Sequence, residues 1–402
     1  MSGALDGIRV LDLTRILAGP MATQTLADLG AEVIKIERPG QGDDTRSWGP
    51  PFIGESGDAA ADSAYFVCCN RGKQSVTVDL AHPEGQEIVR ALACRSDVVV
   101  ENFKVGDLVR FGLGYEQLRA LNPRLVYCSI TGFGQTGPYR ARAGYDPVAQ
   151  ALGGLMSITG TRDGPPQRVG VAMVDVLAST WSVIAILAAL RHRDATGEGQ
   201  HIDTSLLDVQ VSALTNVAQN FLSAGIVTER SGGEHPSVMP SQSFACADGR
   251  VMIVAANDVQ FARLCEVVGV AGLARDPRFL RNSDRVRNRV ELVRILEQQL
   301  VSATAAQWEA RLNDVGVPCG RINDIAQVFA DPQVVHRGMR IEMEHETAKV
   351  LPLVGSPLRL SAAPVEYRRA PPLLGEHTDA VLSRVLNLSA QRLEALRAAG
   401  AI

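Results

Sequence analysis

The chain has 402 residues, of which 46% are apolar and 21% are charged, and its formal net charge at pH 7 is -4. This ordinary composition carries no strongly basic balance, so we expect no nucleic-acid partner. The length exceeds the size at which one hydrophobic core usually stops growing, which favours two lobes.

The cysteines and the N-terminus indicate the compartment. The seven cysteines are odd in number and scattered, which favours reduced thiols over a disulfide framework. No basic region followed by an apolar region, as in an export signal, is found in MSGALDGIRV. We therefore expect a cytoplasmic protein. The apolar stretch 174–190 is shorter than the about 20 residues of a membrane span, so we interpret it as a buried core helix and expect no membrane contact.

Strands and helices alternate through the first half of the chain. The opening segment predicts a strand (GIRVLDLT), a helix from Pro20 to Leu29 that stops at Gly30, and a second strand (EVIKIE). Further β-branched runs, QSVTVDL, DVVVENF and RLVYCSIT, alternate with helical patterns at 83–94 and 115–121. This alternation predicts an α/β fold with a parallel sheet covered by helices on both faces.

The pattern changes after a helix that ends near 222. Residues 231–243 are rich in Gly, Pro and Ser, as in a linker or an active-site loop. A hairpin at 248–249 and amphipathic helices follow, and a last helix is expected near 380–398. We therefore divide the chain into a large lobe (1–224), a smaller α+β lobe (225–325) and a C-terminal segment (326–402) that returns to the large lobe.

A glycine motif follows the strand RLVYCSIT. The spacing of Gly132, Gly134 and Gly137 matches the dinucleotide fingerprint, but no apolar helical period follows it and no acidic residue ends a next strand. A nicotinamide or flavin cofactor is therefore not expected. The histidines show no metal-binding spacing and G-x-S-x-G is absent from the sequence, so neither a metal site nor a serine hydrolase is predicted.

Asp175 stands at the start of the long apolar helix, after a glycine-spaced approach. An acidic residue in a first helical turn is commonly a cap, which stabilises the helix by ~0.5–2 kcal/mol. From the residues alone, capping is the more frequent role. It is compatible with catalysis, because the helix field also keeps a carboxylate ionised, as a carboxylate nucleophile must be.

Ordered strings along nearly the whole chain resemble one family. They are LDLTRILAGP, DLGAEVIKIERPGQGD, NRGKQSVTVDL, VENF, GFGQTGP, AGYDPVAQALGG, GEGQHIDTSLLD, GVPCGRIND, DPQVVHRGM and GEHT. Together they are similar to the class III (CaiB/BaiF) coenzyme A transferases. The run GDDTRSWGPPF at 42–52 resembles the branch that uses dicarboxylic acids, such as succinyl-CoA:glutarate transferases.

The resemblance implies a Rossmann-like large lobe, a smaller lobe and an interlocked homodimer. It implies no permanently bound cofactor, because acyl-CoA and small carboxylic acids are substrates. The matching position makes Asp175 the catalytic residue, which passes CoA on through a mixed anhydride and an aspartyl-CoA thioester. The positions that match CoA contacts are Ile16, Arg38, Val78, Asp79, Leu80, Asn102, Phe103 and Arg110, with Tyr145 near the thioester. Lys73 is a further phosphate candidate, although a solvated surface position is the more frequent one for lysine.

A dicarboxylic acid keeps one carboxylate unreacted, and burying it calls for a cation or several donors. Arg15 and Arg46 are the candidates, because they lie near the ends of the first strands, where open α/β sheets bind ligands. An ordinary ion pair would explain each arginine equally well. Trp48 lies in the same segment. The loop that shields the intermediate in formyl-CoA transferases has its nearest match in Gly232 and Gly233.

Two alternatives remain beside transfer. The family also contains α-methylacyl-CoA racemases, which abstract a proton with the histidine of a G-H-D string. Here the string is Gly144-Tyr145-Asp146, and a tyrosine with an ordinary pKa of about 10 is a poor base at neutral pH. Transfer is therefore favoured. A non-catalytic acyl-CoA-binding subunit is the second alternative, and the intact Asp175 segment argues against it.

Overall fold

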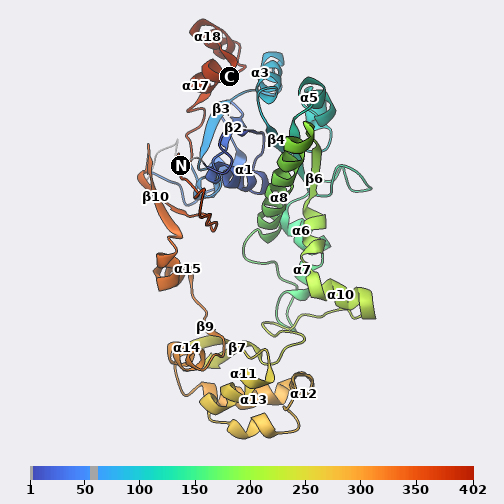
Figure 1. The fold of residues 1–402 in the computed structure, drawn as a ribbon, viewed down its shortest axis with the longest axis vertical. Coiled ribbons are helices and arrows are strands. Elements are labelled where there is room, and N and C mark those ends of the chain that lie inside the picture. The colour runs from blue at the N-terminus through green and yellow to red at the C-terminus, as the bar shows by residue number, and fades with distance from the viewer. Residues whose placement is uncertain (1–2, 55–61) are drawn as a thin grey trace. The chain divides into compact units, whose positions relative to one another are not determined.

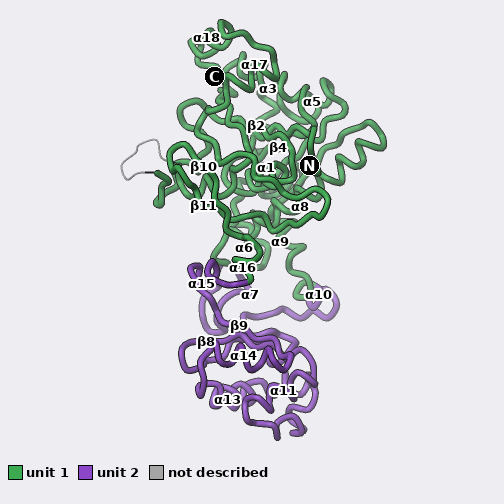
Figure 2. Tube along the Cα trace, turned by 60° about the vertical axis from the view of Figure 1, so that its left-hand side comes forward, with its two compact units in different colours: residues 1–155, 169–218, 333–402 green, residues 156–168, 219–332 purple. Residues whose placement is uncertain are grey.

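The structure is a computed structural model that describes residues 3–54 and 62–402 (Figure 1). The chain forms two compact units (Figure 2). Unit 1 contains Met1–Leu155, Val169–Ala218 and Gln333–Ile402, and unit 2 contains Met156–Arg168 and Gln219–Pro332.

The segment 156–168 belongs to unit 2, whereas the sequence-based division placed it in the large lobe. Its turn is held by residues about 70 positions later: the N–H of Gly232 donates to the carbonyl of Gly160 at 3.0 Å. The other divisions fall at 218/219 and 332/333 rather than at 224/225 and 325/326. A short segment without apolar periodicity carries no local signal of the unit that it joins, which explains the difference.

Unit 1 is built on a six-stranded sheet in the order β3-β2-β1-β4-β5-β6, in which every neighbouring pair is parallel. The predicted α/β fold with a parallel sheet is thereby confirmed. The chain runs outward from β1 on one side and from β4 on the other, so the order reverses between these two strands. Loops that leave the carboxyl ends of β1 and β4 separate there, which is where open α/β sheets bind ligands. The strands are β1 Arg9–Asp12, β2 Glu32–Glu37, β3 Lys73–Thr77, β4 Val98–Glu101, β5 Val126–Thr131 and β6 His201–Ser205.

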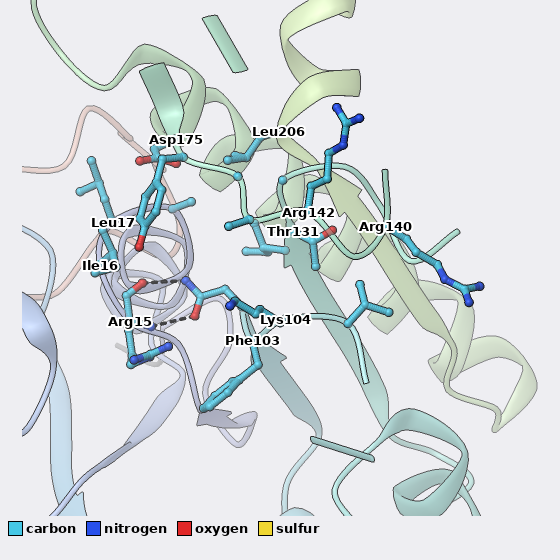
Figure 3. A pocket seen from close by; sticks show the side chains of 18 residues that line it. Arg15, Ile16, Leu17, Phe103, Lys104, Thr131, Arg140, Arg142, Asp175 and Leu206 are labelled. Carbon is cyan, nitrogen blue, oxygen red and sulfur yellow. Dashed lines mark hydrogen bonds between the residues drawn. The ribbon is translucent and has the colours of Figure 1, made fainter. Parts of the chain in front are cut away.

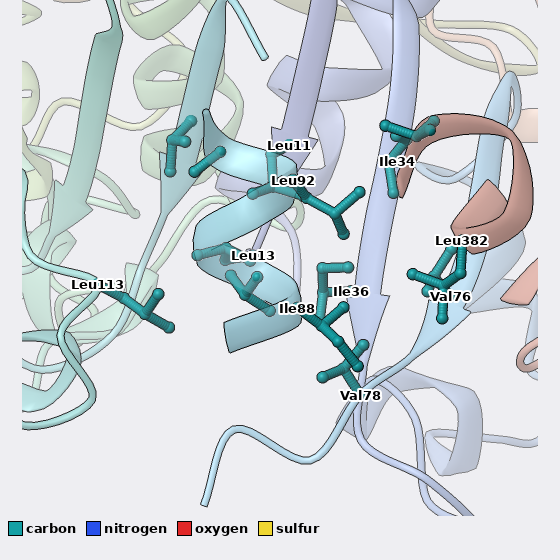
Figure 4. Close-up of a cluster of buried hydrophobic side chains, with 14 of the residues drawn as sticks. Leu11, Leu13, Ile34, Ile36, Val76, Val78, Ile88, Leu92, Leu113 and Leu382 are labelled. Atoms are coloured by element: carbon teal, nitrogen blue, oxygen red, sulfur yellow. The ribbon is translucent and has the colours of Figure 1, made fainter. Parts of the chain in front are cut away.

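Helices cover both faces of this sheet. Alternate strand residues face opposite sides, so Leu11 and Ile34 pack under one helical layer (Figure 4) while Val10 and Val33 pack under the other. The first layer contains α3 Pro83–Ala93, α4 Asp107–Arg110, α5 Tyr115–Leu121, α17 Thr378–Leu386 and α18 Ala390–Ala398. The second contains α1 Ala18–Asp28, α6 Asp146–Leu152, α8 Met173–Thr196 and α9 Leu206–Ser212. The remaining elements of this unit are the 3-10 turn η1 Asp44–Ser47, α2 Ala64–Val67, α16 Pro332–His336 at the boundary with unit 2, and the hairpin β10 Arg340–His345 and β11 Lys349–Val354.

The last predicted helix is in fact two helices. Asn387 has φ 57° and ends α17 in the left-handed conformation, and the hydroxyl of Ser389 accepts the N–H of Arg392 to cap α18. Asparagine tolerates this conformation better than most residues and commonly closes a helix. The periodic pattern alone does not reveal the break.

Helix α8 is long and apolar enough to cross a membrane by length and composition, and half of its most apolar window is buried. Val174, Ala178 and Ile186 lie in the core of unit 1 against the sheet and α1. Trp181 and Ile184, on the other side of the helix, are about half exposed. The helix therefore has one packed face and one uncovered apolar face.

Unit 2 has a core of its own around the antiparallel sheet β7-β8-β9. The predicted hairpin at 248–249 joins its first two strands. The side chain of Arg285 is fully buried there and donates to the carbonyl of Met239 and to the carboxylate of Asp258. The strands are β7 Ser241–Cys246, β8 Gly249–Val254 and β9 Cys319–Arg321. The helices are α7 Leu155–Ile158 and α10 Thr215–Ala224 at the unit boundaries, α11 Asp258–Val268, η2 Ala271–Arg275, α12 Asn282–Arg287, α13 Arg289–Leu300, α14 Ala305–Asp314 and α15 Ile325–Ala330.

Candidate active site

Two adjoining pockets lie at the carboxyl ends of the strands of unit 1, where the strand order reverses. The aspartate pocket (Figure 3) has a volume of about 160 Å³ and is lined by 15–18, 102–105, 130–132, 140, 142–145, 175 and 206. The strand-end pocket has a volume of about 330 Å³ and is lined by 13–15, 35–38, 41–44, 78–80, 103 and 111. Arg15 and Phe103 line both, so the two pockets adjoin at these residues.

The loop after β1 forms the boundary between the pockets. Ile16 has φ 72°, a conformation that a β-branched residue adopts only when its surroundings impose it. The surroundings are specific: Asn102 accepts the N–H of Arg15 at 2.9 Å and donates to the carbonyl of Arg15 at 2.7 Å. The carboxylate of Asp43 accepts the N–H of Ile16 at 3.2 Å. The loop is therefore held in one shape by side chains from two neighbouring strand ends.

A buried cluster of charges lies beneath this loop. The side chains of Lys35 and Lys73 are both fully buried, and they pair with Asp43 at 2.9 Å and with Asp12 at 3.0 Å. Burial by itself would raise the pKa of Asp12, but the two lysines and two threonine hydroxyls outweigh it and lower that pKa to about 2. The expectation that Lys73 is a solvated surface residue is therefore wrong. Its ammonium also donates to the carbonyl of Pro20, so it is held within the core.

The guanidinium of Arg46 is enclosed in the same region. It donates to both carboxylate oxygens of Glu37, to both of Asp62, and to the carbonyl of Pro372. Only 8% of the side chain is exposed, so no donor is free for a substrate. The prediction that Arg46 binds a distal carboxylate is corrected. The residue forms structural ion pairs, because its guanidinium is bonded to the carboxylates of Glu37 and Asp62.

Arg15 differs from Arg46 in its exposure. Its side chain is 47% exposed and lines both pockets, and it pairs with Asp44 at 3.0 Å on the open side. Arg140 and Arg142 line the aspartate pocket as well, and within the described residues neither forms an ion pair. Sequence reasoning missed these two arginines, although the string YRAR directly after GFGQTGP was a signal for basic residues near the glycine turn.

Asp175 lies in the first turn of α8 but does not cap it. A carboxylate oxygen of Asp146 accepts the N–H of Val174 at 2.7 Å and that of Asp175 at 3.4 Å, so Asp146 satisfies the free end of the helix. The capping interpretation of Asp175 is therefore wrong. Within 3–54 and 62–402, the Asp175 carboxylate accepts no hydrogen bond, and it lines the aspartate pocket (Figure 3).

Burial, together with the charge of Asp146, raises the pKa of Asp175 to about 7. The expectation that the helix field keeps this carboxylate fully ionised does not hold, because loss of hydration and a like charge outweigh it. The phenol of Tyr65 is close enough to respond: burial and then the charge of Asp175 raise the pKa of Tyr65 to about 12. Tyr65 therefore remains a neutral donor near the carboxylate, which sequence reasoning missed.

The glycine turn after β5 and the segment before α6 line the aspartate pocket together. A side chain on Gly132 would come within 2.6 Å of the backbone of Gly144, so the two glycines let the turn and the start of α6 cross closely. Tyr145 follows at this crossing and lines the pocket. The next helix begins only at Asp146, so the glycine motif does not open a helix as a dinucleotide site requires.

The remaining predicted site residues divide between the pockets and other places. Arg38, Val78, Asp79 and Leu80 line the strand-end pocket, and Ile16 and Asn102 line the aspartate pocket. Arg110 lies on α4, pairs with Asp107 at 2.7 Å and lines neither pocket. Trp48 also lines neither, and its ring meets that of Tyr65 edge to face at 5.4 Å. Gly232 and Gly233 belong to unit 2. Within the described chain, no group of three or more His, Cys, Asp or Glu side chains is arranged to hold a metal ion.

Comparisons with known proteins agree on one family. A family model described as CoA-transferase family III matches residues 5–378. The chain is 47% identical to the succinate–glutarate CoA-transferase of Agrobacterium fabrum. The alignment of 386 residues covers 95% of each of the two chains. It is 45% identical to the succinyl-CoA:glutarate CoA-transferase of Mus musculus over 99% of this chain and 90% of that protein. The crystal structure of a CaiB/BaiF family protein from Brucella suis, 47% identical, matches 96% of this chain and 100% of its own with a TM-score of 0.86.

Proposed function

The chain belongs to CoA-transferase family III and is therefore an enzyme of the CoA-transferase class, and we propose that it moves CoA from succinyl-CoA, or a similar acyl-CoA, to a dicarboxylic acid through Asp175. The observation that carries this proposal is the Asp175 carboxylate, which is largely buried in a pocket and has no hydrogen-bond partner in the described chain. A carboxylate with few partners has lone pairs available for attack. The relatives named for succinyl-CoA and glutarate support the choice of substrates.

The reaction conserves its charges and needs no proton transfer. A carboxylate oxygen of Asp175 attacks the thioester carbonyl, the C–S bond breaks, and CoA leaves as a thiolate from a mixed anhydride. The thiolate then attacks the aspartyl carbonyl, the donor acid leaves as a carboxylate, and an aspartyl-CoA thioester remains. The acceptor carboxylate repeats both steps in reverse order, which regenerates Asp175 and releases the new acyl-CoA.

The surroundings of Asp175 suit these steps. The raised pKa of Asp175 makes its carboxylate a stronger nucleophile than an exposed one once it is ionised. Leu17 and Ala18 line the pocket at the start of α1, where the first N–H groups of a helix have no partner within it. Such N–H groups can stabilise the oxyanion of each tetrahedral intermediate. We assign the nucleotide end of CoA to the strand-end pocket, because Arg38 lines it and a guanidinium binds phosphate oxygens well.

The distal carboxylate of a dicarboxylic substrate needs a cation near Asp175. With Arg46 enclosed, Arg15 is the remaining predicted residue for this role, and Arg140 and Arg142 lie on the same pocket. An arginine can hold a carboxylate with two parallel hydrogen bonds. We assign the first place to Arg15, because it lies at the junction of the two pockets.

Trapping of the covalent intermediate tests the function. The full-length protein is incubated with succinyl-CoA and then with hydroxylamine, which cleaves an anhydride or a thioester to a hydroxamate. We expect a hydroxamate at Asp175 by peptide mass spectrometry, and loss of all transfer to glutarate in the Asp175→Ala and Asp175→Asn variants. Turnover retained by either folded variant would refute the assignment, and an unlabelled protein with several acyl-CoAs would favour a binding subunit without chemistry.

A further inference from the structure

A third cavity adjoins the aspartate pocket and contains a carboxylate that the reaction above does not use. The cavity has a volume of about 360 Å³ and shares Lys104 and Val105 with the aspartate pocket. Glu101, the last residue of β4, lines it and is only 6% exposed. A buried glutamate needs specific partners, because an unpaired charge is costly in the interior. Its partners therefore indicate its role.

The partners of Glu101 connect it with the loop that follows β4. One carboxylate oxygen accepts the N–H of Phe103 at 2.8 Å, which closes the turn directly after the strand. Ser129 stands opposite Glu101 in the register of β4 and β5. The Ser129 hydroxyl lies 3.0 Å from Nε2 of His201, and the ring of Tyr115 stacks on that imidazole at 4.8 Å. The Glu101 carboxylate therefore lies between the polar side chains of Ser129 and His201 and the Asn102–Phe103 segment.

The Asn102–Phe103 segment is in contact with both substrate pockets. The side-chain amide of Asn102 accepts the backbone N–H of Arg15 and donates to the backbone carbonyl of Arg15, as the dashed lines of Figure 3 show. The ring of Phe103 lies under the guanidinium of Arg15, 5.2 Å from it, and lines both pockets. If the Phe103 N–H moved, the neighbouring Asn102 would move with it and would displace the backbone of Arg15 and Ile16.

We propose that Glu101 is a positioning residue for the CoA thioester, which holds the Asn102–Phe103 segment and, through Asn102, the backbone of Arg15 and Ile16 in the shape that lines both pockets. The proposal rests on the CoA-transferase function proposed above. It gives a reason for a buried carboxylate at this place: an ionised acceptor holds an N–H more strongly than a neutral one. Glu101 touches no reacting atom in this arrangement, so its effect is on binding rather than on the chemical step.

The charge state of Glu101 supplies a signature for this role. Burial raises the pKa of Glu101 to about 7, against the opposing effect of the Ser129 hydroxyl and the Phe103 N–H. The charges of Asp203 and Asp107 raise it further. The other ionisable groups around it are Tyr127 and Cys128 on β5, whose pKa values are raised by burial, His201 on β6, whose pKa is lowered by burial, and Lys104 at the cavity wall. The shifts of Tyr127, Cys128 and His201 all lead away from pH 7, but Asp175 in the adjoining pocket also has a pKa raised to about 7. The part of the pH step in CoA affinity that Asp175→Asn retains and Glu101→Gln removes is therefore the part that follows Glu101.

Binding of free coenzyme A, measured by calorimetry from pH 5.5 to 8.5, tests the proposal without turnover. The wild-type dissociation constant should rise as the pH falls through about 7, because protonation weakens the bond to the Phe103 N–H. Glu101→Gln should bind CoA about tenfold more weakly at pH 8 and should lose the pH step that Asp175→Asn retains. Glu101→Asp keeps the charge and can reach the N–H two residues on, so it should restore the step. Ser129→Ala keeps the bond to Phe103 but removes a stabilising donor, so its midpoint should move to higher pH.

The outcomes separate positioning from general stability. A merely structural Glu101 would lower the melting temperature and the active fraction of Glu101→Gln while the dissociation constant and its pH step stay as in the wild type, and that result would overturn the proposal. If Glu101→Gln does not fold, an unmoved midpoint in Ser129→Ala would overturn it instead. A wild-type protein that binds no CoA at any pH would refute the proposed function itself, which is a different result from a wild type and a Glu101→Gln variant that bind equally well.

Discussion

At the scale of single residues, the environment of Asp175 opposes the charge that the proposed reaction needs. Burial and the charge of Asp146 raise its pKa to about 7, so the proposed nucleophile is only partly ionised at neutral pH. The ionised form attacks, so kcat at saturating acyl-CoA should rise as the pH rises through about 7 and should fall about tenfold per pH unit well below it. Rapid-quench or steady-state rates from pH 5 to 9 measure this. A flat profile would show that chemistry does not limit turnover or that Asp175 is ionised throughout.

The same shift predicts the pH dependence of stability. A carboxyl whose pKa is raised on folding stabilises the native state below its unfolded value of about 4 and loses that contribution as the pH rises through about 7. Asp175→Asn removes the cost of the buried charge. The variant should therefore gain stability over the wild type as the pH rises from about 4 to 7, by about 4 kcal/mol in urea unfolding at pH 8 and by less than half of that at pH 5. A difference between the two proteins that does not depend on pH would contradict the assigned pKa.

Arginine substitutions distinguish a substrate contact from a structural ion pair. Arg15→Met should lower kcat/KM for a dicarboxylate acceptor more than for a monocarboxylate of equal length, by about 2–4 kcal/mol, because the distal carboxylate loses its partner. Arg46→Met is the matched control. It leaves Glu37 and Asp62 buried without a cation, so it should cost about 3–5 kcal/mol of unfolding free energy and lower the activity with both acids alike. Equal losses for both acid types in Arg15→Met would show that Arg15 does not bind the distal carboxylate.

At the scale of elements, the start of α8 shows how the fold leaves free the side chain that we propose as the nucleophile. Asp146, at the start of α6, caps α8 from outside, so the Asp175 carboxylate is not needed for capping. Asp146→Asn keeps a side-chain oxygen for the cap but removes the negative charge. The acid limb of kcat should then move to lower pH by about one unit. Asp146→Ala should in addition lose about 0.5–2 kcal/mol of stability. A shift of the acid limb in the alanine variant but not in the asparagine variant would show that the cap, and not the charge, controls Asp175.

Element boundaries were predictable where the sequence carries a local signal. The helix at 115–121 was predicted at its observed ends, because an apolar period follows Gly114 directly. The break at Asn387 was not, because asparagine is compatible with both a continued helix and a left-handed turn. The segment 156–168 joins unit 2 through bonds to residues far along the chain, which no local pattern can reveal.

At the scale of the whole molecule, the uncovered face of α8 bears on assembly. Trp181, Ile184 and Leu187 are 48%, 49% and 37% exposed and recur every three residues, so they form one apolar stripe. An exposed stripe of this kind commonly marks an interaction surface, and it supports the proposal that the enzyme is a homodimer.

Light scattering tests the dimer. We expect a mass of twice 43.0 kDa at micromolar concentration, and dissociation in Trp181→Glu, which would bring a charge into the contact from each copy. Val290→Glu is the matched control, because Val290 is 82% exposed and lies on α13 in unit 2. A monomeric wild-type protein, or a Trp181→Glu variant that stays dimeric, would exclude this face as the contact.

The family, the α/β class and the alternation of strands and helices along the first half of the chain were predictable from the sequence, because periodicity, turn residues and ordered motifs are local properties of the chain. The sequence also indicated Asp175, and most of the site residues that it predicted line the two pockets. Which charged side chains are available for binding depends on the folded structure. Arg46 is enclosed by Glu37 and Asp62, and Lys73 is paired with Asp12. Asp146 caps α8, and the partners of Glu101 come from the adjoining strand and loop. Burial and ion pairing depend on contacts between distant segments, so a residue's sequence neighbours do not fix its charge state or its exposure.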